Sequence, residues 1–170
     1  MTVIELKRSI RVYPHQLTSD LKNTILTESR KQLNNNCSED IGYIINILEV
    51  SSLLDNYIEN SSSDIVVVVL LLADVFRPKI DDVEDGKVIA IYADGTLMEI
   101  RDVQKILIPT STYSSEYEFS NDMLKPLKPD TSPIKKGDVV KIKIKAMRYN
   151  DHAFSCIGEF NLKENSNYNK

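Results

Sequence analysis

Several residue types that mark secreted, metal-binding or redox proteins are scarce in this chain of 170 residues. It has no tryptophan and only two cysteines, Cys37 and Cys156, which lie far apart and show no metal-knuckle spacing. This favours a reduced, intracellular protein. The first residues lack the basic-then-apolar order of a secretory signal, and the longest apolar run, residues 65–73, is about half of what spans a bilayer. We therefore expect a soluble protein.

Catalytic motifs are also lacking. Neither His15 nor His152 has a Cys, Ser or Asp at a motif spacing. Gly86 precedes a lysine but has no upstream glycine to form a phosphate loop. An acidic group could hold a divalent ion but is more simply an exposed linker; it comprises Asp81, Asp82, Glu84 and Asp85. The sequence predicts a protein that is not an enzyme, with no catalytic residues, no cofactor and no metal.

Charge is unevenly distributed along the chain, although the net charge is only −4. No basic residue lies between Lys31 and Arg77, a stretch that holds several acidic residues. From Lys135 to Arg148 the balance reverses, with six basic residues against Asp138 alone. Such asymmetry indicates two different partner surfaces, or two solvated faces that happen to differ.

The first half of the chain reads as a β-α-β-β module. Residues 3–13 alternate apolar and polar as in a strand, and Pro14 ends it. A helix follows, with Thr18 or Ser19 as the expected N-cap and an asparagine run at its end. Residues 42–50 and 65–75 are two further strands. Since the last is continuously apolar, we expect both of its faces to be buried.

Arg77-Pro78 marks a break, after which five short strands are expected. They cover residues 87–92, 96–100, 105–108, 139–147 and 153–162, while residues 111–133 read as a long loop with at most one helical turn. This spacing predicts a barrel of the OB type. The fold class is therefore α+β, with a ribonucleoprotein-like module at residues 1–78, an OB-fold barrel at 79–170, and a disordered tail from about 163.

One strand carries the strongest local pattern. Val140, Ile142, Ile144 and Ala146 alternate with three lysines, Lys141, Lys143 and Lys145. With the aliphatic set inside a barrel, the ammonium groups form an outer row about 6–7 Å apart, which matches the phosphate repeat of a single strand. Lys135, Lys136 and Arg148 extend this row into a predicted RNA-binding set. The alternative is an edge strand that lysines protect from aggregation.

Stacking aromatics would support the nucleic-acid interpretation. Tyr92, Tyr149 and Phe154 lie near the ends of the predicted barrel strands. Each of them also suits packing at the core or rim of the barrel.

Five stretches in this order resemble one family. Residues 10–17 are similar to its V-x-P-x-x-L entry into the helix, 42–45 to its second strand, and 73–78 to its A-x-x-F-x-P junction. Residues 136–144 and 154–158 look like its last two barrel strands. The family is the stalk subunit of multisubunit DNA-directed RNA polymerases, which comprises the seventh subunit of the eukaryotic nuclear enzymes and its archaeal counterpart.

The resemblance implies a non-catalytic subunit of transcription. Its first module would dock on the polymerase core beside the clamp of the largest subunit, near Pro14, His15, Gly42 and Tyr43. A fourth-subunit homologue would lie between the modules, and the barrel would meet nascent single-stranded RNA. Such a protein would work inside the cell and not in a membrane.

Two departures from the family are visible. Residues 86–109 are shorter than the usual front half of the barrel, and residues 53–63 form a brief tip that is not rich in glycine. A divergent copy from a large DNA virus would explain both, together with the abundance of Asn, Ile and Lys. Its location would then be the host cytoplasm or the virion rather than the nucleus. The alternative function is a free-standing OB-fold RNA-binding protein of translation or RNA decay.

Overall fold

The computed structural model describes residues 2–17, 20–62 and 64–162, and the chain divides into two units, Met1–Arg77 and Pro78–Lys170. The first unit is a sheet with one helix and the second contains a closed five-stranded barrel, so the expected α+β fold class is confirmed. Thr18 and Ser19, expected as helix caps, and the tail from residue 163, expected to be disordered, lie outside the described residues.

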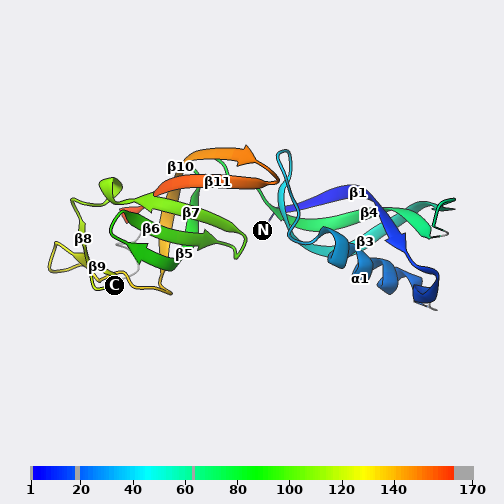
Figure 1. Cartoon of the computed structure of the whole chain (residues 1–170), viewed down its shortest axis with the longest axis horizontal. Coiled ribbons are helices and arrows are strands. Elements are labelled where there is room, and N and C mark those ends of the chain that lie inside the picture. The colour runs from blue at the N-terminus through cyan, green and yellow to red at the C-terminus, as the bar shows by residue number, and fades with distance from the viewer. Residues whose placement is uncertain (1, 18–19, 63, 163–170) are drawn as a thin grey trace. The chain divides into compact units, whose positions relative to one another are not determined.

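The first unit is a four-stranded antiparallel sheet in the order β1-β4-β3-β2, with α1 on one face (Figure 1). Its elements are β1 (Thr2–Val12), η1 (Pro14–Gln16), α1 (Leu21–Leu33), β2 (Cys37–Ser38), β3 (Gly42–Ile58) and β4 (Ile65–Phe76). The sequence predicts every one of them except the two-residue β2 and the 3-10 turn η1.

Helix α1 begins later than its sequence suggests. Asp20 is the N-cap, and its carboxylate accepts a hydrogen bond from the Asn23 backbone N–H at 3.2 Å. At the other end the Asn34 side chain accepts from the Ile47 backbone N–H at 3.2 Å. Asp20, expected within the first turn, is therefore the residue that begins the helix, because its short carboxylate reaches an otherwise unpaired donor.

Strand β4 has one buried face and one face that is buried only near the two ends of the strand. Val67, Val69 and Leu71 are almost completely buried in the core that α1 and β1 complete. On the other face Leu70 and Leu72 are only half-buried. Val66 and Phe76 on that face are buried, so the expectation of two buried faces is wrong only for the middle of the second face.

Strand β3 runs well past its expected end at residue 50. It pairs with β4 over its full length, and its register shifts at four places, at regular intervals of three residues. Every residue from Ser51 to Ile58 is exposed. Pairing with β4 keeps this exposed stretch extended, while the bulges increase its twist.

The second unit contains a barrel that closes in the order β10-β11-β7-β6-β5 (Figure 1). Its strands are β5 (Val83–Tyr92), β6 (Gly95–Ile100), β7 (Gln104–Pro109), β10 (Val139–Asn150) and β11 (Ala153–Phe160). The pairing of β7 with β11 is parallel and the others are antiparallel. Five strands closed in this order form the barrel of the OB type that the sequence predicts.

The expected loop at residues 111–133 contains a β-hairpin instead. After the short turn η2 (Thr110–Thr112), β8 (Tyr117–Ser120) pairs with β9 (Met123–Pro126). Tyr113 and Tyr117 pack on the Phe160 ring of the barrel, with centroids 5.2 and 6.2 Å away. The sequence does not reveal that Tyr113 and Tyr117 are buried, because the segment around them is polar and contains three prolines.

Candidate nucleic-acid and docking surfaces

Strand β10 places its aliphatic and basic side chains on opposite faces over its first half. Val140, Ile142 and Ile144 are buried in the barrel. Lys141 and Lys143 alternate with them and reach the outer face. This part of the strand has the arrangement that its alternating sequence predicts.

A β-bulge at Lys145 changes the second half of β10. Ile144 pairs with Gly158, but the next pair is Ala146 with Ile157, so Lys145 is the extra residue. Ala146, expected inside the barrel, is exposed, and the outward face now carries Ala146, Arg148 and Asn150. A bulge shifts the alternation by one residue. Without it, Arg148 would point to the same side as Ile142 and Ile144.

Each of the three lysines of β10 faces a carboxylate. The Lys141 ammonium group lies 2.8 Å from the Asp85 carboxylate. The corresponding distances are 3.9 Å from Lys143 to Asp81 and 3.4 Å from Lys145 to Glu159. The acids come from β5, the turn before it and β11, so a scan along β10 alone does not reveal them. A phosphate that binds here must compete with these ion pairs.

The other predicted cations are less constrained. Lys135 and Lys136 lie on the exposed segment before β10, where the Asp138 carboxylate accepts from the Lys135 backbone N–H at 2.9 Å rather than from its ammonium group. Within the described residues, the side chains of Lys135, Lys136 and Arg148 make no ion pair. These three cations are the most available of the predicted set.

The aromatic residues expected to stack on bases differ in exposure. Tyr92 is 58% exposed at the end of β5. Phe154 is buried, and the half-buried Tyr149 packs on it with ring centroids 5.0 Å apart. Tyr92 alone of the three presents an open ring.

The four residues expected near a docking tip are not brought together. Pro14 and His15 follow the end of β1, where Val12 pairs with Ile65. Gly42 and Tyr43 lie at the other end of the sheet, where Tyr43 pairs with Phe76. About ten residues of β4 separate the two ends, or roughly 35 Å at 3.3 Å per residue. Gly42 and Tyr43 are also buried, whereas Pro14 and His15 are exposed.

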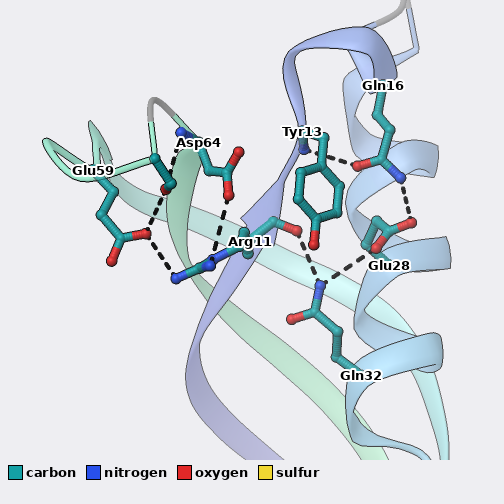
Figure 2. Close-up of polar contacts among 8 residues, drawn as sticks. Arg11, Tyr13, Gln16, Glu28, Gln32, Glu59 and Asp64 are labelled. Atoms are coloured by element: carbon teal, nitrogen blue, oxygen red, sulfur yellow. Dashed lines mark hydrogen bonds and ion pairs between the residues drawn. The ribbon is translucent and has the colours of Figure 1, made fainter.

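Polar contacts hold the Pro14–Gln16 turn against α1 (Figure 2). The Gln16 side chain accepts from the Tyr13 backbone N–H at 2.8 Å and donates to buried Glu28 at 2.6 Å. Gln32 donates to the Arg11 carbonyl at 3.0 Å, which ties α1 to the end of β1. The Tyr13 and His15 rings stack 5.8 Å apart on this turn.

The same end of the sheet is tied to the β3–β4 hairpin. The Arg11 guanidinium lies 2.7 Å from the Glu59 carboxylate and 3.6 Å from that of Asp64 (Figure 2). We call this region, made up of residues 13–17, 20–21, 57–62 and 64, the distal end. Its exposed large apolar side chains are Tyr13, Leu17, Leu21, Tyr57 and Ile58. A fixed backbone that displays apolar side chains is typical of a protein-binding surface.

Titratable groups with perturbed pKa values are few. Burial raises the pKa of the Cys156 thiol to about 11, and burial also raises that of Cys37, so both thiols are protonated at neutral pH. Burial, and then the charge of Asp82, raises the pKa of Glu84, which faces the barrel interior at the start of β5. In the described part of the chain no three His, Cys, Asp or Glu residues are grouped to hold a metal ion.

Part of the first unit is similar in sequence to a known domain family. Residues 7–63 match the SHS2 domain found in the N terminus of Rpb7p/Rpc25p/MJ0397. Over these residues the first unit is similar to an SHS2 domain of this Rpb7 type. The match begins within β1, includes α1, β2 and β3, and does not reach the barrel.

No curated protein matches the sequence. Within residues 2–17, 20–62 and 64–162, no helix has the length and apolar character needed to cross a bilayer.

Proposed function

We propose that this chain is a non-catalytic subunit of a DNA-directed RNA polymerase, which forms the stalk and contacts nascent RNA. The observation that carries the proposal is the similarity of residues 7–63 to an SHS2 domain of the Rpb7 type, followed in the same chain by a closed five-stranded barrel. The five sequence stretches that resemble the stalk family extend the likeness across both units. We accordingly assign residues 1–78 to docking and residues 79–170 to RNA.

The docking role falls to the distal end of the first unit. Its partner is the polymerase core near the clamp of the largest subunit, with a fourth-subunit homologue as a second partner. Pro14 and His15 lie there, beside Tyr13 and the exposed aliphatic side chain of Ile58. Gly42 and Tyr43 are buried at the other end of the sheet, so their part in docking is to stabilise the domain.

The RNA role falls to the basic side chains of the second unit. Lys135, Lys136 and Arg148 support it most directly, because they are exposed and make no ion pair within the described residues. The lysines of β10 add positive potential but already face carboxylates. Neutralised phosphates release counterions, so this contact should weaken as salt rises.

The proposed setting is the interior of the cell. A nuclear polymerase is one such setting. The abundance of Asn, Ile and Lys supports the other, a polymerase encoded by a large DNA virus that works in the host cytoplasm or is packaged in the virion.

The test is affinity purification of the tagged full chain from its native source. We expect polymerase catalytic subunits to be recovered with it in near-equal amounts. Recovery of the chain alone, or with ribosomes or an RNA-decay complex, would overturn the polymerase assignment. The second outcome would favour the free-standing RNA-binding alternative.

A further inference from the structure

The bulge in β10 creates a hollow on the outer face of the β10–β11 hairpin. Its volume is about 500 Å³, and it is lined by Ala146, Met147, Arg148, Asn150, Ser155 and Ile157. The hollow is wide open to solvent, so a ligand would lie on it rather than be enclosed. The small Ala146 side chain leaves room where a larger residue would fill the surface.

The hollow combines one apolar wall with polar side chains. Ile157 pairs with Ala146 across the strands and is 46% exposed. Ile157 also pairs with Leu107, another exposed aliphatic residue, so the apolar surface continues onto β7. Side chains opposite each other in such pairs have Cβ atoms about 4.5–5.5 Å apart. A flat apolar group can therefore lie on this wall.

The polar side has donors and acceptors suited to a nucleotide. Arg148 pairs directly with Ser155, and Asn150 follows on the same outer face. A guanidinium binds phosphate in a bidentate manner, while amide and hydroxyl groups can bind a base edge. Arg148 is also the one predicted cation of β10 that faces no carboxylate among the described residues. An anionic ligand meets no competing ion pair there.

We propose that this hollow binds one nucleotide of single-stranded RNA. The base lies on Ile157 and Ala146, Asn150 and Ser155 contact its edge, and Arg148 binds the adjacent phosphate. The inference rests on the proposed RNA contact and assigns it to particular side chains. The bulge at Lys145 is its structural cause, because it turns both Ala146 and Arg148 outward.

The experiment measures binding of the full chain to two labelled probes, an oligouridine and an abasic ribose-phosphate oligomer of the same length. Ala146→Leu fills the hollow without removing charge. We expect it to lower oligouridine affinity about tenfold, the value of one lost base contact, and to leave its salt dependence and the abasic affinity unchanged. Arg148→Gln should weaken both probes and reduce the log–log salt slope by about 0.7.

Two control variants separate this site from general effects. Ala93→Leu adds the same bulk at an exposed alanine in the β5–β6 turn, and should leave both affinities unchanged. Lys145→Gln removes a cation that faces Glu159, and should reduce the slope less than Arg148→Gln does. Equal melting temperatures for all four variants and the parent chain would exclude misfolding as the cause.

Each other outcome counts against the site in a different way. Oligouridine affinity that is unchanged in Ala146→Leu would overturn the nucleotide site and leave the polymerase assignment standing. Loss of a co-purified polymerase subunit in Ala146→Leu, with RNA affinity retained, would make the hollow a protein-binding site and also overturn the inference. A parent chain that binds neither probe would remove the RNA contact itself, whereas co-purification would still test the docking role.

Discussion

At the scale of single residues, Gly42 occupies a constrained backbone position of the first unit. Its φ is +84°, in the left-handed region, and a Cβ placed there would lie 2.2 Å from the Phe76 carbonyl oxygen and 2.6 Å from the Arg77 Cα. Both neighbours are backbone atoms, which cannot rotate away. The glycine therefore lets β3 start against the end of β4.

We expect Gly42→Ala to destabilise the chain by about 2–5 kcal/mol, the sum of left-handed strain and overpacking. Gly137→Ala is the matched control, since Gly137 also has a positive φ, of +94°, but nothing lies within 4 Å of its Cβ position. It should cost only the strain, about 1–2 kcal/mol. Urea unfolding monitored by circular dichroism measures both. Equal losses would show that the close approach of β4 does not matter.

Glu84 gives a prediction for pH dependence. Its side chain faces the barrel interior, where burial first and Asp82 second raise its pKa. A carboxyl group whose folded-state pKa is raised stabilises the fold below its ordinary pKa of about 4.3, and that contribution is lost as pH rises through the folded value. We therefore expect Glu84→Gln to be more stable than the parent chain at pH 7 and to lose this advantage near pH 4.

Urea midpoints at the two pH values test this, with Glu118→Gln as a control for the loss of one acidic charge at an exposed position of β8. An advantage of Glu84→Gln that persists unchanged at pH 4 would contradict the explanation. The effect should be small, because Glu84 is only half-buried and solvent screens its charge.

The sequence of β10 predicts the positions of some of its side chains but not of all. Its alternation correctly places Val140, Ile142 and Ile144 inside the barrel. It is wrong for Ala146, because a bulge depends on the pairing with β11, where Ile157 rather than the buried Cys156 lies opposite. The acids that face the lysines are equally invisible, since they come from other strands. The periodicity of a sequence describes one strand at a time. The bulge and the ion pairs both depend on how β10 pairs with its neighbouring strands.

At the scale of elements, the β8–β9 hairpin is the largest element that the sequence does not predict. Its turn, Asn121-Asp122, has positive φ at both residues, as a two-residue hairpin turn requires. Polar residues and prolines around it obscure this short signal. The buried Leu124 of β9, hydrogen-bonded to Ile134 through backbone bonds of 2.9 Å in both directions, attaches the hairpin to the segment before β10.

This hairpin can be tested with two leucines. Leu124 is completely buried, so Leu124→Ala should cost about 2–5 kcal/mol through lost burial and a cavity. Leu127, three residues later, is 53% exposed, and Leu127→Ala should cost less than about 0.5 kcal/mol. Chemical unfolding of the full chain measures the difference. Two near-neutral variants would mean that the segment is a loop, as its composition suggests.

Strand β4 illustrates a second limit at this scale. Its unbroken aliphatic sequence predicts burial on both faces, yet Leu70 and Leu72 are half-buried on the face away from α1. Val66 and Phe76 on the same face are buried, so the prediction fails only in the middle of the strand, where coverage by other elements is incomplete. The elements themselves were predictable because long β-branched runs and the break at Arg77-Pro78 are strong local signals.

At the scale of the whole molecule, the two units carry different surfaces, apolar at the distal end of the first and basic on the second. The charge asymmetry of the sequence predicts two different surfaces, but neither the apolar character of the first nor which residues share a surface. The family resemblance groups four residues at one docking site, but the sheet separates them into two pairs. Pro14 and His15 lie at one end of the sheet, and Gly42 and Tyr43 lie at the other. A strand of about ten residues separates its two ends, and that distance appears only once the strand pairing is known.

The docking role therefore depends on the distal end, and Ile58 tests it. This side chain is 67% exposed on the hairpin that Arg11 holds in place through Glu59. Ile58→Asp places an unpaired charge in any apolar interface formed there, which costs several kcal/mol on binding. We expect at least a tenfold loss of co-purified polymerase core, since about 1.4 kcal/mol already changes affinity tenfold.

Val139→Asp is the matched control, because Val139 is a β-branched residue of almost equal exposure, 66%, on the barrel. It should leave recovery of the polymerase core unchanged, and neither variant should alter the melting temperature, since both positions are exposed. If Val139→Asp reduced recovery while Ile58→Asp did not, the surface that binds the polymerase would lie on the second unit. Docking through the first unit would then be wrong even if the chain is a polymerase subunit.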